Sequence, residues 1–286
     1  MMANPVLKWA GGKRKIANRL IQLMPSEFGT YFEPFLGGSA MFLAVNPPVS
    51  VLADVNRHLI NFYSTLVKDP RKLTEALEIF RSRFDSLTPI AQKELYYSVR
   101  TEFNLQNSSE SSVVNPEDDA LRMALNFYIL NKLGFNGLYR ENRGGEFNVP
   151  FGGKKNFPGI DHHNFLAVAS RLSSSRLSTG DFSSVVENSR GDDFVYFDPP
   201  YIPLTPTASF TSYSRAGFGL KEQERLADTM RKLTSRGVKV MMSNSDTELT
   251  RSIFCDFDLV TIEAPRVISS KSSTRGNVSE VVARNY

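Results

Sequence analysis

The sequence predicts an α/β protein with a doubly wound, mostly parallel sheet of seven strands and an inserted, mainly helical domain. The first observation behind this prediction is that short apolar runs alternate with segments of helical periodicity, which is typical of parallel strands joined by crossover helices. The second is a gap in this alternation between residues 54 and 175. An interruption of that length inside an α/β sheet is most simply an inserted module.

The expected strands are short runs rich in β-branched and aromatic residues, and Gly, Pro or polar residues bound them. They cover residues 31–33, 49–53, 176–179, 194–197, 238–243, 257–262 and 278–285. Apolar residues spaced three and four apart predict the helices that separate most of these strands, at residues 13–24, 39–45, 56–67, 161–172, 182–188, 221–235 and 247–253. The last strand follows a polar stretch without periodicity, so we expect it to return antiparallel.

The insertion is expected to contain helices followed by a loop. Helical periodicity predicts helices at residues 70–86, 92–106 and 117–133, with a polar linker at residues 107–112. Residues 134–155 are rich in Gly, Asn and Arg and resemble an exposed loop or hairpin. Long excursions of this kind tend to carry binding functions. We therefore expect one domain from residues 1–57 and 160–286, and a second from residues 58–159.

The distribution of charge favours a polyanionic partner. The 286 residues include 34 Lys and Arg against 30 Asp and Glu, which gives a formal net charge of +4. Basic residues crowd the acid-free N-terminal segment and recur in the middle of the chain, at Lys8, Lys13, Arg14, Lys15, Arg19, Arg140, Arg143, Lys154, Lys155, Arg171 and Arg176. Such clusters are typical of a nucleic-acid-binding surface, and a solvated basic face is the alternative interpretation.

Composition excludes several other classes of protein. Cys255 is the only cysteine, so the chain forms no intramolecular disulfide and no thiolate metal cluster. His162 and His163 have no further ligands near them in the sequence, so we expect no metal site. No apolar segment approaches the roughly 20 residues that span a bilayer, and the first residues lack a signal peptide's apolar core. We expect a soluble, cytoplasmic protein with no membrane partner.

The stretch Asp198-Pro199-Pro200-Tyr201 follows directly after an expected buried strand. Because proline has no N–H and a fixed φ, we expect both proline carbonyls to stay unpaired at the carboxyl edge of the sheet. A carboxylate, backbone carbonyls and an aromatic face suit a planar substrate with an exocyclic amino group, which describes a nucleobase. The alternative is a strand that ends in a proline turn capped by Asp198.

A glycine turn and two more strand ends predict a nucleoside pocket. Residues 32–39 place two glycines between a strand and a helix, where backbone can approach a ligand closely. Asp54 follows the next strand at the spacing by which an acidic residue hydrogen-bonds a ribose diol, or it caps the following helix. Asp181 and Phe182 follow the third strand, where they would hold the adenine of a nucleoside cofactor or serve as a helix cap and a core residue.

Five motifs resemble the signature set of the DNA adenine methylase family, in the same order. They are KWAGGK at residues 8–13, FEPFLG at 32–37, NGLYR at 136–140, FNVPFG at 147–152 and DPPY at 198–201. The resemblance implies a class I methyltransferase with a Rossmann-like sheet that uses S-adenosylmethionine to methylate N6 of adenine in double-stranded DNA. It is close to the GATC-modifying branch, including members paired with restriction enzymes. Ser39 stands where the family usually has glycine, and we expect a slightly altered turn with cofactor binding retained.

The resemblance also implies a role for each matching residue. The cofactor would be held by Trp9, Lys13, Phe35, Gly37, Asp54, Asp181, Phe182 and Asp198, without a metal ion. Methyl transfer would rest on Asp198, Pro199, Pro200 and Tyr201. DNA would be contacted by Lys8, Phe135, Asn136, Leu138 and Arg140. Residues 1–57 and 160–286 would then form the S-adenosylmethionine-binding catalytic domain, and residues 58–159 the target-recognition domain of a monomer.

The implied mechanism requires the adenine to leave the duplex. Asp198 and the Pro199 carbonyl would accept its two amino hydrogens, Tyr201 would stack on its plane, and residues 210–213 would belong to a loop that closes over it. A silent DNA-binding subunit with the same fold is one alternative. A cytosine-N4 methyltransferase, which usually has Ser in place of this Asp, is another.

On the DNA side, the resemblance places one reader and two wedge residues in the loop after the inserted helices. Arg140 would aim its guanidinium at O6 and N7 of a guanine in the major groove. Phe135 and Leu138 would touch or wedge into the duplex near the target, or would instead form a small core within the loop.

Overall fold

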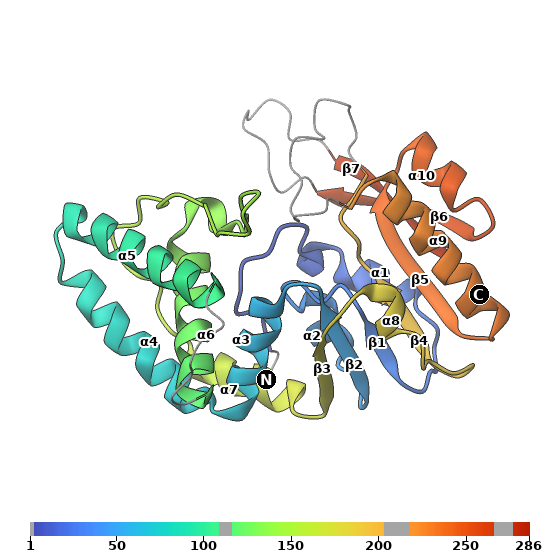
Figure 1. The fold of residues 1–286 in the computed structure, drawn as a ribbon. Helices are drawn as coiled ribbons and strands as arrows, with labels where there is room; N and C mark the ends of the chain where they lie inside the picture. The colour runs from blue at the N-terminus through green and yellow to red at the C-terminus, as the bar shows by residue number, and fades with distance from the viewer. Residues whose placement is uncertain (1–2, 109–115, 203–217, 266–276) are drawn as a thin grey trace. The chain divides into compact units, whose positions relative to one another are not determined.

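The computed structural model describes residues 3–108, 116–202, 218–265 and 277–286 (Figure 1). The chain divides into two compact units, which are described separately below. The first unit comprises Met1–Gly12, Gly37–Ser39 and Asn56–Thr179, and the second comprises Lys13–Leu36, Ala40–Val55 and Gly180–Tyr286.

The structure contains a seven-stranded sheet with the order β3-β2-β1-β4-β5-β7-β6. The strands are β1 Tyr31–Glu33, β2 Ser50–Asp54, β3 Ser175–Thr179, β4 Phe194–Phe197, β5 Lys239–Ser245, β6 Asp258–Pro265 and β7 Asn277–Arg284. β1 is parallel to β2 and β4, and β4 is parallel to β5, whereas β7 runs antiparallel to β5 and β6. The predicted doubly wound, mostly parallel sheet with an antiparallel last strand is therefore confirmed.

The order of the strands reverses beside β1. The chain proceeds from β1 to β2 and β3 on one side, and then returns to place β4 on the other side. In open parallel sheets, the carboxyl ends of strands at such a reversal form the usual binding crevice. Because β1 ends at Glu33 and β4 leads into Asp198, the topology brings these two carboxylates to that edge.

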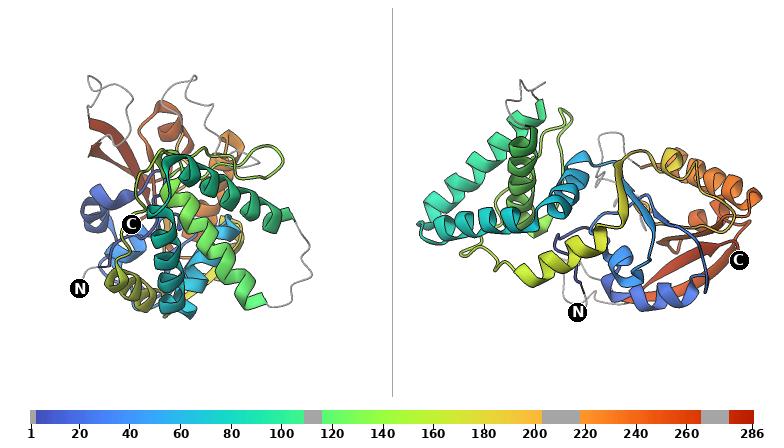
Figure 2. Two further views of the ribbon diagram at one scale, coloured as in Figure 1. Left: turned by 90° about the vertical axis from the view of Figure 1, so that its left-hand side faces the viewer. Right: turned by 90° about the horizontal axis from the view of Figure 1, so that it is seen from below.

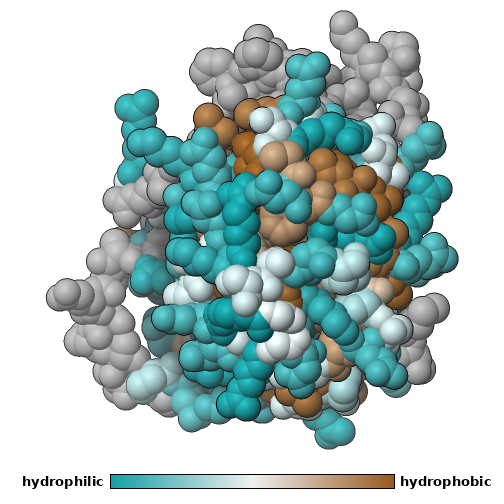
Figure 3. All heavy atoms as spheres, turned by 90° about the vertical axis from the view of Figure 1, so that its right-hand side faces the viewer, coloured by the Kyte–Doolittle hydropathy of each residue, from teal (hydrophilic) through white to brown (hydrophobic). Residues whose placement is uncertain are grey.

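One apolar cluster of the second unit lies between the sheet and α9. Its helices are η1 Lys13–Lys15, α1 Ala17–Leu23, α2 Ala40–Val45, α8 Phe182–Val185, α9 Leu220–Ser235 and α10 Glu248–Ile253. Leu226 and Met230 lie one helical turn apart on α9, and they share one buried cluster with Phe197, Val240 and Met242 of β4 and β5. On the face drawn in Figure 3, hydrophilic side chains cover most of the described surface, and hydrophobic ones gather in a band near the top.

The first unit is a helical assembly with an aromatic interior. Its helices are α3 Arg57–Lys68, α4 Pro70–Asp85, α5 Pro89–Ser108, α6 Pro116–Leu133, η2 Phe135–Gly137 and α7 His162–Leu172. The views in Figure 2 show α4, α5 and α6 side by side, and α3 also packs on α6. Asn56, Asp69 and Asp161 cap α3, α4 and α7, because each side chain accepts hydrogen bonds from backbone N–H groups of the first turn.

The segment after α6 is an anchored hairpin. Antiparallel bridges join Gly134 to Phe151 and Glu141 to Phe147. Asn104 of α5 exchanges two hydrogen bonds with the backbone of Phe147, at 2.8 and 3.1 Å. Helix α5 of the first unit therefore holds this hairpin at Phe147, near its turn.

Three expected helices differ from the structure, and one of them, α5, begins at Pro89 where the prediction placed the start at residue 92. Residues 13–24 form a 3₁₀ turn followed by α1, because Ile16 at the start of α1 has no side chain to cap it and the side chain of Lys13 is buried. α8 ends at Val185, where the prediction placed the end at residue 188.

Parts of three expected segments, the linker at 107–112, the loop at 210–213 and the polar stretch before β7, lie outside the described residues. Across the ranges that are described, no helix is both long and apolar enough to span a membrane.

Candidate active site

Asp198 forms the centre of a buried polar cluster in the second unit. Its side chain is 20% exposed, and Lys13 Nζ lies 2.8 Å from Oδ1 with only 5% of the lysine side chain exposed. Ser243 of β5 donates a hydrogen bond to the same oxygen at 3.2 Å, and its hydroxyl is 2.8 Å from that of Tyr196. Burial raises the pKa of Asp198, while the Lys13 ammonium and the hydrogen bonds oppose that rise.

Tyr201 is held on both its hydroxyl and its ring. The hydroxyl donates to Glu280 Oε2 on β7 at 2.7 Å. Lys13 Nζ lies 4.4 Å from the ring centroid, within the range of a cation–π contact. The ammonium thus contacts both Asp198 and Tyr201, the two side chains that the sequence predicts to grip a base.

The two proline carbonyls have different partners. The Pro200 carbonyl accepts a hydrogen bond from Gln223 Nε2 at 2.8 Å, so the prediction that both carbonyls stay unpaired is wrong for Pro200. A buried amide on α9 reaches this carbonyl, and nothing in the local sequence marks that contact. From the residues that the structure describes, the Pro199 carbonyl accepts no hydrogen bond.

Glu33 lies in the candidate site, and the sequence did not single it out. It ends β1, is 2% exposed, and accepts a hydrogen bond from the Tyr31 hydroxyl at 2.7 Å. Burial raises the pKa of Glu33 to about 8, which leaves the group largely protonated at neutral pH. The available signal was a carboxyl residue at the end of a short buried strand, within the motif at residues 32–37.

Asp54 and Asp181 follow strands, as expected. Asp54 ends β2 and is partly buried, and its carbonyl accepts a hydrogen bond from Gly180 at 3.2 Å. Asp181 caps α8, and Arg225 donates to both of its carboxylate oxygens at 2.8 and 2.6 Å. These hydrogen bonds hold the pKa of Asp181 well below its usual range. Since Oδ2 accepts from Arg225 alone among the described residues, it retains capacity for one more donor.

Phe182 is a core residue in this structure. It is 3% exposed, its ring stacks on Phe35 at a centroid distance of 5.3 Å, and the Arg225 guanidinium lies 4.0 Å from its centroid. Phe35 remains only partly buried. Phe35 therefore offers more accessible aromatic surface than Phe182 does.

The glycine turn is shaped by Trp9 within the first unit. Gly37 has φ of +47°, and a Cβ there would lie 2.7 Å from Trp9 Cδ1, so only glycine fits this close approach. The indole also stacks on Tyr139 with a centroid distance of 5.9 Å. Ser39 is buried with φ of 58°, and its hydroxyl accepts from Tyr63 at 3.2 Å. The backbone of Ser39 thus adopts the left-handed conformation that favours glycine, and its side chain is held there by the hydrogen bond from Tyr63.

The expected DNA-contacting residues are grouped in the first unit. The Asn131 side chain bonds the N–H and the carbonyl of Lys8 at 2.9 and 2.7 Å. The side chain of Lys8 lies so close to Gly137 that a Cβ on this glycine would be 2.6 Å from it. Lys8 is therefore adjacent to the loop that carries the other predicted readers.

These loop residues are largely exposed. Phe135 is 52% exposed, which contradicts the alternative that it forms a small loop core, whereas Leu138 is partly buried. Asn136 is exposed with φ of 56°. Arg140 is exposed, and its Nε donates to Asn148 at 2.7 Å.

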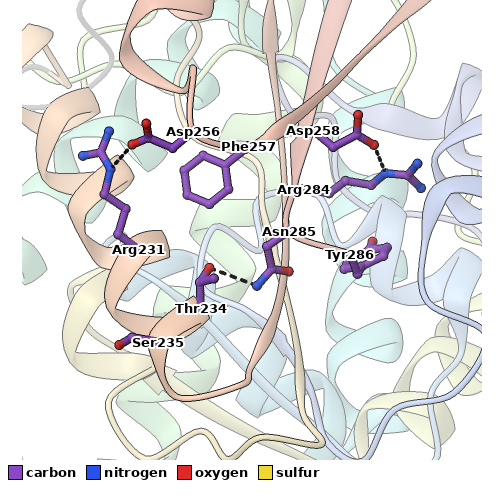
Figure 4. A pocket seen from close by; sticks show the side chains of 9 residues that line it. All are labelled: Arg231, Thr234, Ser235, Asp256, Phe257, Asp258, Arg284, Asn285 and Tyr286. Atoms are coloured by element: carbon purple, nitrogen blue, oxygen red, sulfur yellow. Dashed lines mark hydrogen bonds and ion pairs between the residues drawn. The ribbon is translucent and has the colours of Figure 1, made fainter.

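A cavity of about 500 Å³ lies at a different edge of the second unit (Figure 4). Two ion pairs flank it, Arg231 with Asp256 at 2.7 Å and Arg284 with Asp258 at 2.9 Å. Asp258 begins β6, and Arg284 ends β7, where it pairs with Met241 near the start of β5. The cavity therefore lies at the edge of the sheet that is away from the carboxyl end of β5. Because the charges are paired and no predicted site residue lines the cavity, it is not the candidate active site.

The described part of the chain also contains no cluster of three or more His, Cys, Asp or Glu able to bind a metal.

Comparisons with known proteins identify the family of this chain. The family model of D12 class N6 adenine-specific DNA methyltransferases matches residues 9–268. The type II methyltransferase M1.LlaDCHI of Lactococcus lactis subsp. cremoris is 37% identical over 284 residues, which is 99% of this chain and 95% of the relative. M.MjaIII of Methanocaldococcus jannaschii is 37% identical over the full length of both chains. The DNA adenine methylase of Escherichia coli K12 is 37% identical, with 97% of this chain and 93% of the relative covered. The chain therefore belongs to the family of D12 class N6 adenine-specific DNA methyltransferases.

Proposed function

We propose that this adenine-specific DNA methyltransferase transfers the methyl group of S-adenosylmethionine to N6 of an adenine flipped out of double-stranded DNA, within GATC. The main supporting observation is that Asp198, the Pro199 carbonyl and Tyr201 follow one another directly after β4, at the edge where the strand order reverses. The GATC target rests on the resemblance of the five motifs to GATC-modifying members of the family.

The donor and acceptor chemistry of the second unit fits the cofactor. Asp54, Asp181 and Asp198 each follow a strand, and carboxylates suit the hydroxyl and amino hydrogens of a nucleoside. Asp181 has one acceptor position left at Oδ2, and Phe35 has an accessible ring. When bound, S-adenosylmethionine supplies a methyl group activated by a sulfonium centre. The proposed binding residues are Trp9, Lys13, Phe35, Gly37, Asp54, Asp181, Phe182 and Asp198.

The chain's own residues prepare the base. The lone pair of the adenine amino group is delocalised into the ring, so the nitrogen is a poor nucleophile. Asp198 and the Pro199 carbonyl accept its two hydrogens, which favours a pyramidal nitrogen and frees the lone pair. Tyr201 stacks on the extruded base and sets its orientation. The Lys13 ammonium favours the ionised form of the Asp198 carboxylate, and it leaves the ring face of Tyr201 when the base stacks there.

Target recognition is assigned to residues 58–159 together with Lys8. We place Phe135, Asn136 and Leu138 against the duplex near the extruded base. Arg140 reads a guanine by a bidentate contact to O6 and N7. The exposure of Phe135 and Arg140 supports this assignment. The protein acts on duplex DNA as a monomer.

Tritiated methyl transfer tests this proposal on a duplex with one GATC site and on a matched duplex with the same bases in another order. We expect N6-methyladenine in the first duplex only. Asp198→Asn should lower the turnover number by about 10²-fold or more, because it removes the charged acceptor at the transferring nitrogen. Asp256→Asn, beside the unrelated cavity, is the control and should keep full activity. N4-methylcytosine in the product, or unchanged turnover by Asp198→Asn, would refute the proposal.

A further inference from the structure

Two buried amides hold the backbone that follows Asp198. Gln223 of α9 is 1% exposed, and Asn244 of β5 is fully buried. Gln223 Nε2 donates to the Pro200 carbonyl at 2.8 Å. Asn244 Nδ2 donates to Gln223 Oε1 at 3.1 Å, and Asn244 Oδ1 accepts from the Ile202 N–H at 2.9 Å. The chain of hydrogen bonds therefore runs from one side of Tyr201 to the other.

The direction of every hydrogen bond in this chain is fixed. Asn244 Oδ1 accepts from the backbone N–H groups of Ile202 and Ser245, so its Nδ2 has to face Gln223. Gln223 then presents Oε1 to Asn244 and has only Nε2 left for the Pro200 carbonyl. If either amide rotated by 180°, a buried donor would face another donor, or a buried acceptor would face another acceptor, and both would lose their hydrogen bonds.

The pair therefore makes the two proline carbonyls unequal. Pro200 has its carbonyl occupied by Gln223, whereas the Pro199 carbonyl accepts no hydrogen bond from the residues that the structure describes. Tyr201 lies between the two anchor points, and its hydroxyl is held separately by Glu280. Backbone that is bonded at Pro200 and Ile202 has little freedom to rotate the intervening peptides.

We propose that Gln223 and Asn244 are positioning residues for methyl transfer, which fix the Pro199 carbonyl as the backbone acceptor beside Asp198 and orient the ring of Tyr201. They act through the backbone and do not touch the base. The inference rests on the proposed function, since it assumes that Asp198 and the Pro199 carbonyl grip the amino group. Small errors in such geometry lower turnover more than they lower affinity.

Gln223→Met removes the donor and keeps most of the side-chain volume. We expect the turnover number to fall on the order of 10²-fold, while the dissociation constants for S-adenosylmethionine and for a GATC duplex stay unchanged. Asn285→Leu is the matched control, because the Asn285 amide also holds backbone on two sides, donating to the Val238 carbonyl and accepting from the Val240 N–H, and it lies beside the unrelated cavity. It should lose stability without the loss of turnover. An equal loss of turnover in both variants would overturn the inference.

Gln223→Glu tests the donor itself and preserves the shape of the side chain. A carboxylate here cannot donate to Pro200, but a protonated carboxyl can, and both hydrogen-bond partners of the Gln223 side chain, the Pro200 carbonyl and the Asn244 amide, are uncharged. The turnover of Gln223→Glu divided by that of Gln223→Met should therefore rise as the pH falls. A ratio that is independent of pH contradicts a role for the donated hydrogen bond.

Asn244→Asp provides an independent variant if the substitutions at Gln223 prevent folding. It replaces the donor that faces Gln223 with an acceptor, so Gln223 has to turn its own oxygen toward Pro200. We expect the same loss of turnover as in Gln223→Met, and no further loss when the two are combined. Additive losses would overturn the inference. If Asp198→Asn is inactive while these variants turn over normally, only the inference fails; if Asp198→Asn is active, the proposed function fails.

Discussion

Replacement of Lys13 by methionine should destabilise the protein by a pH-dependent amount. The ammonium lies 2.8 Å from Asp198 Oδ1, and the two side chains are only 5% and 20% exposed. Removal of one partner from a buried ion pair typically costs about 3–5 kcal/mol, because the other charge is left without compensation. We expect the free energy of unfolding of Lys13→Met to fall by about this amount near pH 8.

The sign of the pH dependence follows from Asp198. Burial already raises the pKa of this carboxyl in the folded protein, and the loss of Lys13 raises it further. A raised pKa in the folded state means that stability is greatest below the unfolded pKa, near 4, and is lost as the pH rises through the folded value. The difference between wild type and Lys13→Met should therefore be small at acidic pH and should grow as the pH rises.

Urea denaturation at several pH values between about 4 and 8 measures this difference. Lys72→Met is the control, because Lys72 pairs with Asp118 at 3.2 Å with both side chains more than half exposed, and such pairs contribute about 0–1 kcal/mol. The double variant with Asp198→Asn should recover part of the lost stability. A loss for Lys13→Met that is the same at every pH, or no larger than that of Lys72→Met, would refute the reasoning.

Three further predictions concern other parts of the chain. Gly153→Ala should lower the free energy of unfolding by about 1–2 kcal/mol, because Gly153 has a φ of +69°. Gly37→Ala should lower it by more, because a Cβ at Gly37 would also lie 2.7 Å from the indole of Trp9. Urea denaturation of both variants measures the two losses. In the wild type, the Glu33 carboxyl is protonated in the folded state, so its contribution to the free energy of unfolding declines as the pH rises from about 4.5 through about 8. Glu33→Gln should remove this decline, and an identical pH profile of the unfolding free energy for both proteins would contradict the prediction. Arg140→Ala should lose about 1–3 kcal/mol of discrimination at one guanine, and equal selectivity on base-substituted duplexes would remove it from the readers.

The fold was more predictable than the site. Apolar runs such as Phe194–Phe197 and the helical spacing on α9 are local signals, so they identified the elements of the sheet and the antiparallel last strand. The break between η1 and α1 was missed because periodicity does not show that the side chain of Lys13 is buried. A tertiary contact changed the local structure there.

Within the site, the sequence identified residues that lie on motifs and missed those that arrive from elsewhere. Asp198 and Tyr201 belong to one short stretch with distinctive chemistry. Gln223, Asn244 and Glu280 are ordinary polar residues on a helix and two strands, and their spacing shows nothing of the bonds that they make. Their relevance follows only from the sheet order, which places β5 beside β4 and β7 beside β5.

The place of β7 constrains how a nascent chain matures. This strand leaves the ribosome after β5 and β6, yet it inserts between them. Until residues 277–284 emerge, β6 has no neighbour to pair with, the edge of β5 is unpaired and the hydroxyl of Tyr201 lacks Glu280. A chain stalled before residue 277 therefore lacks both the strand that joins β5 to β6 and the carboxylate that holds Tyr201.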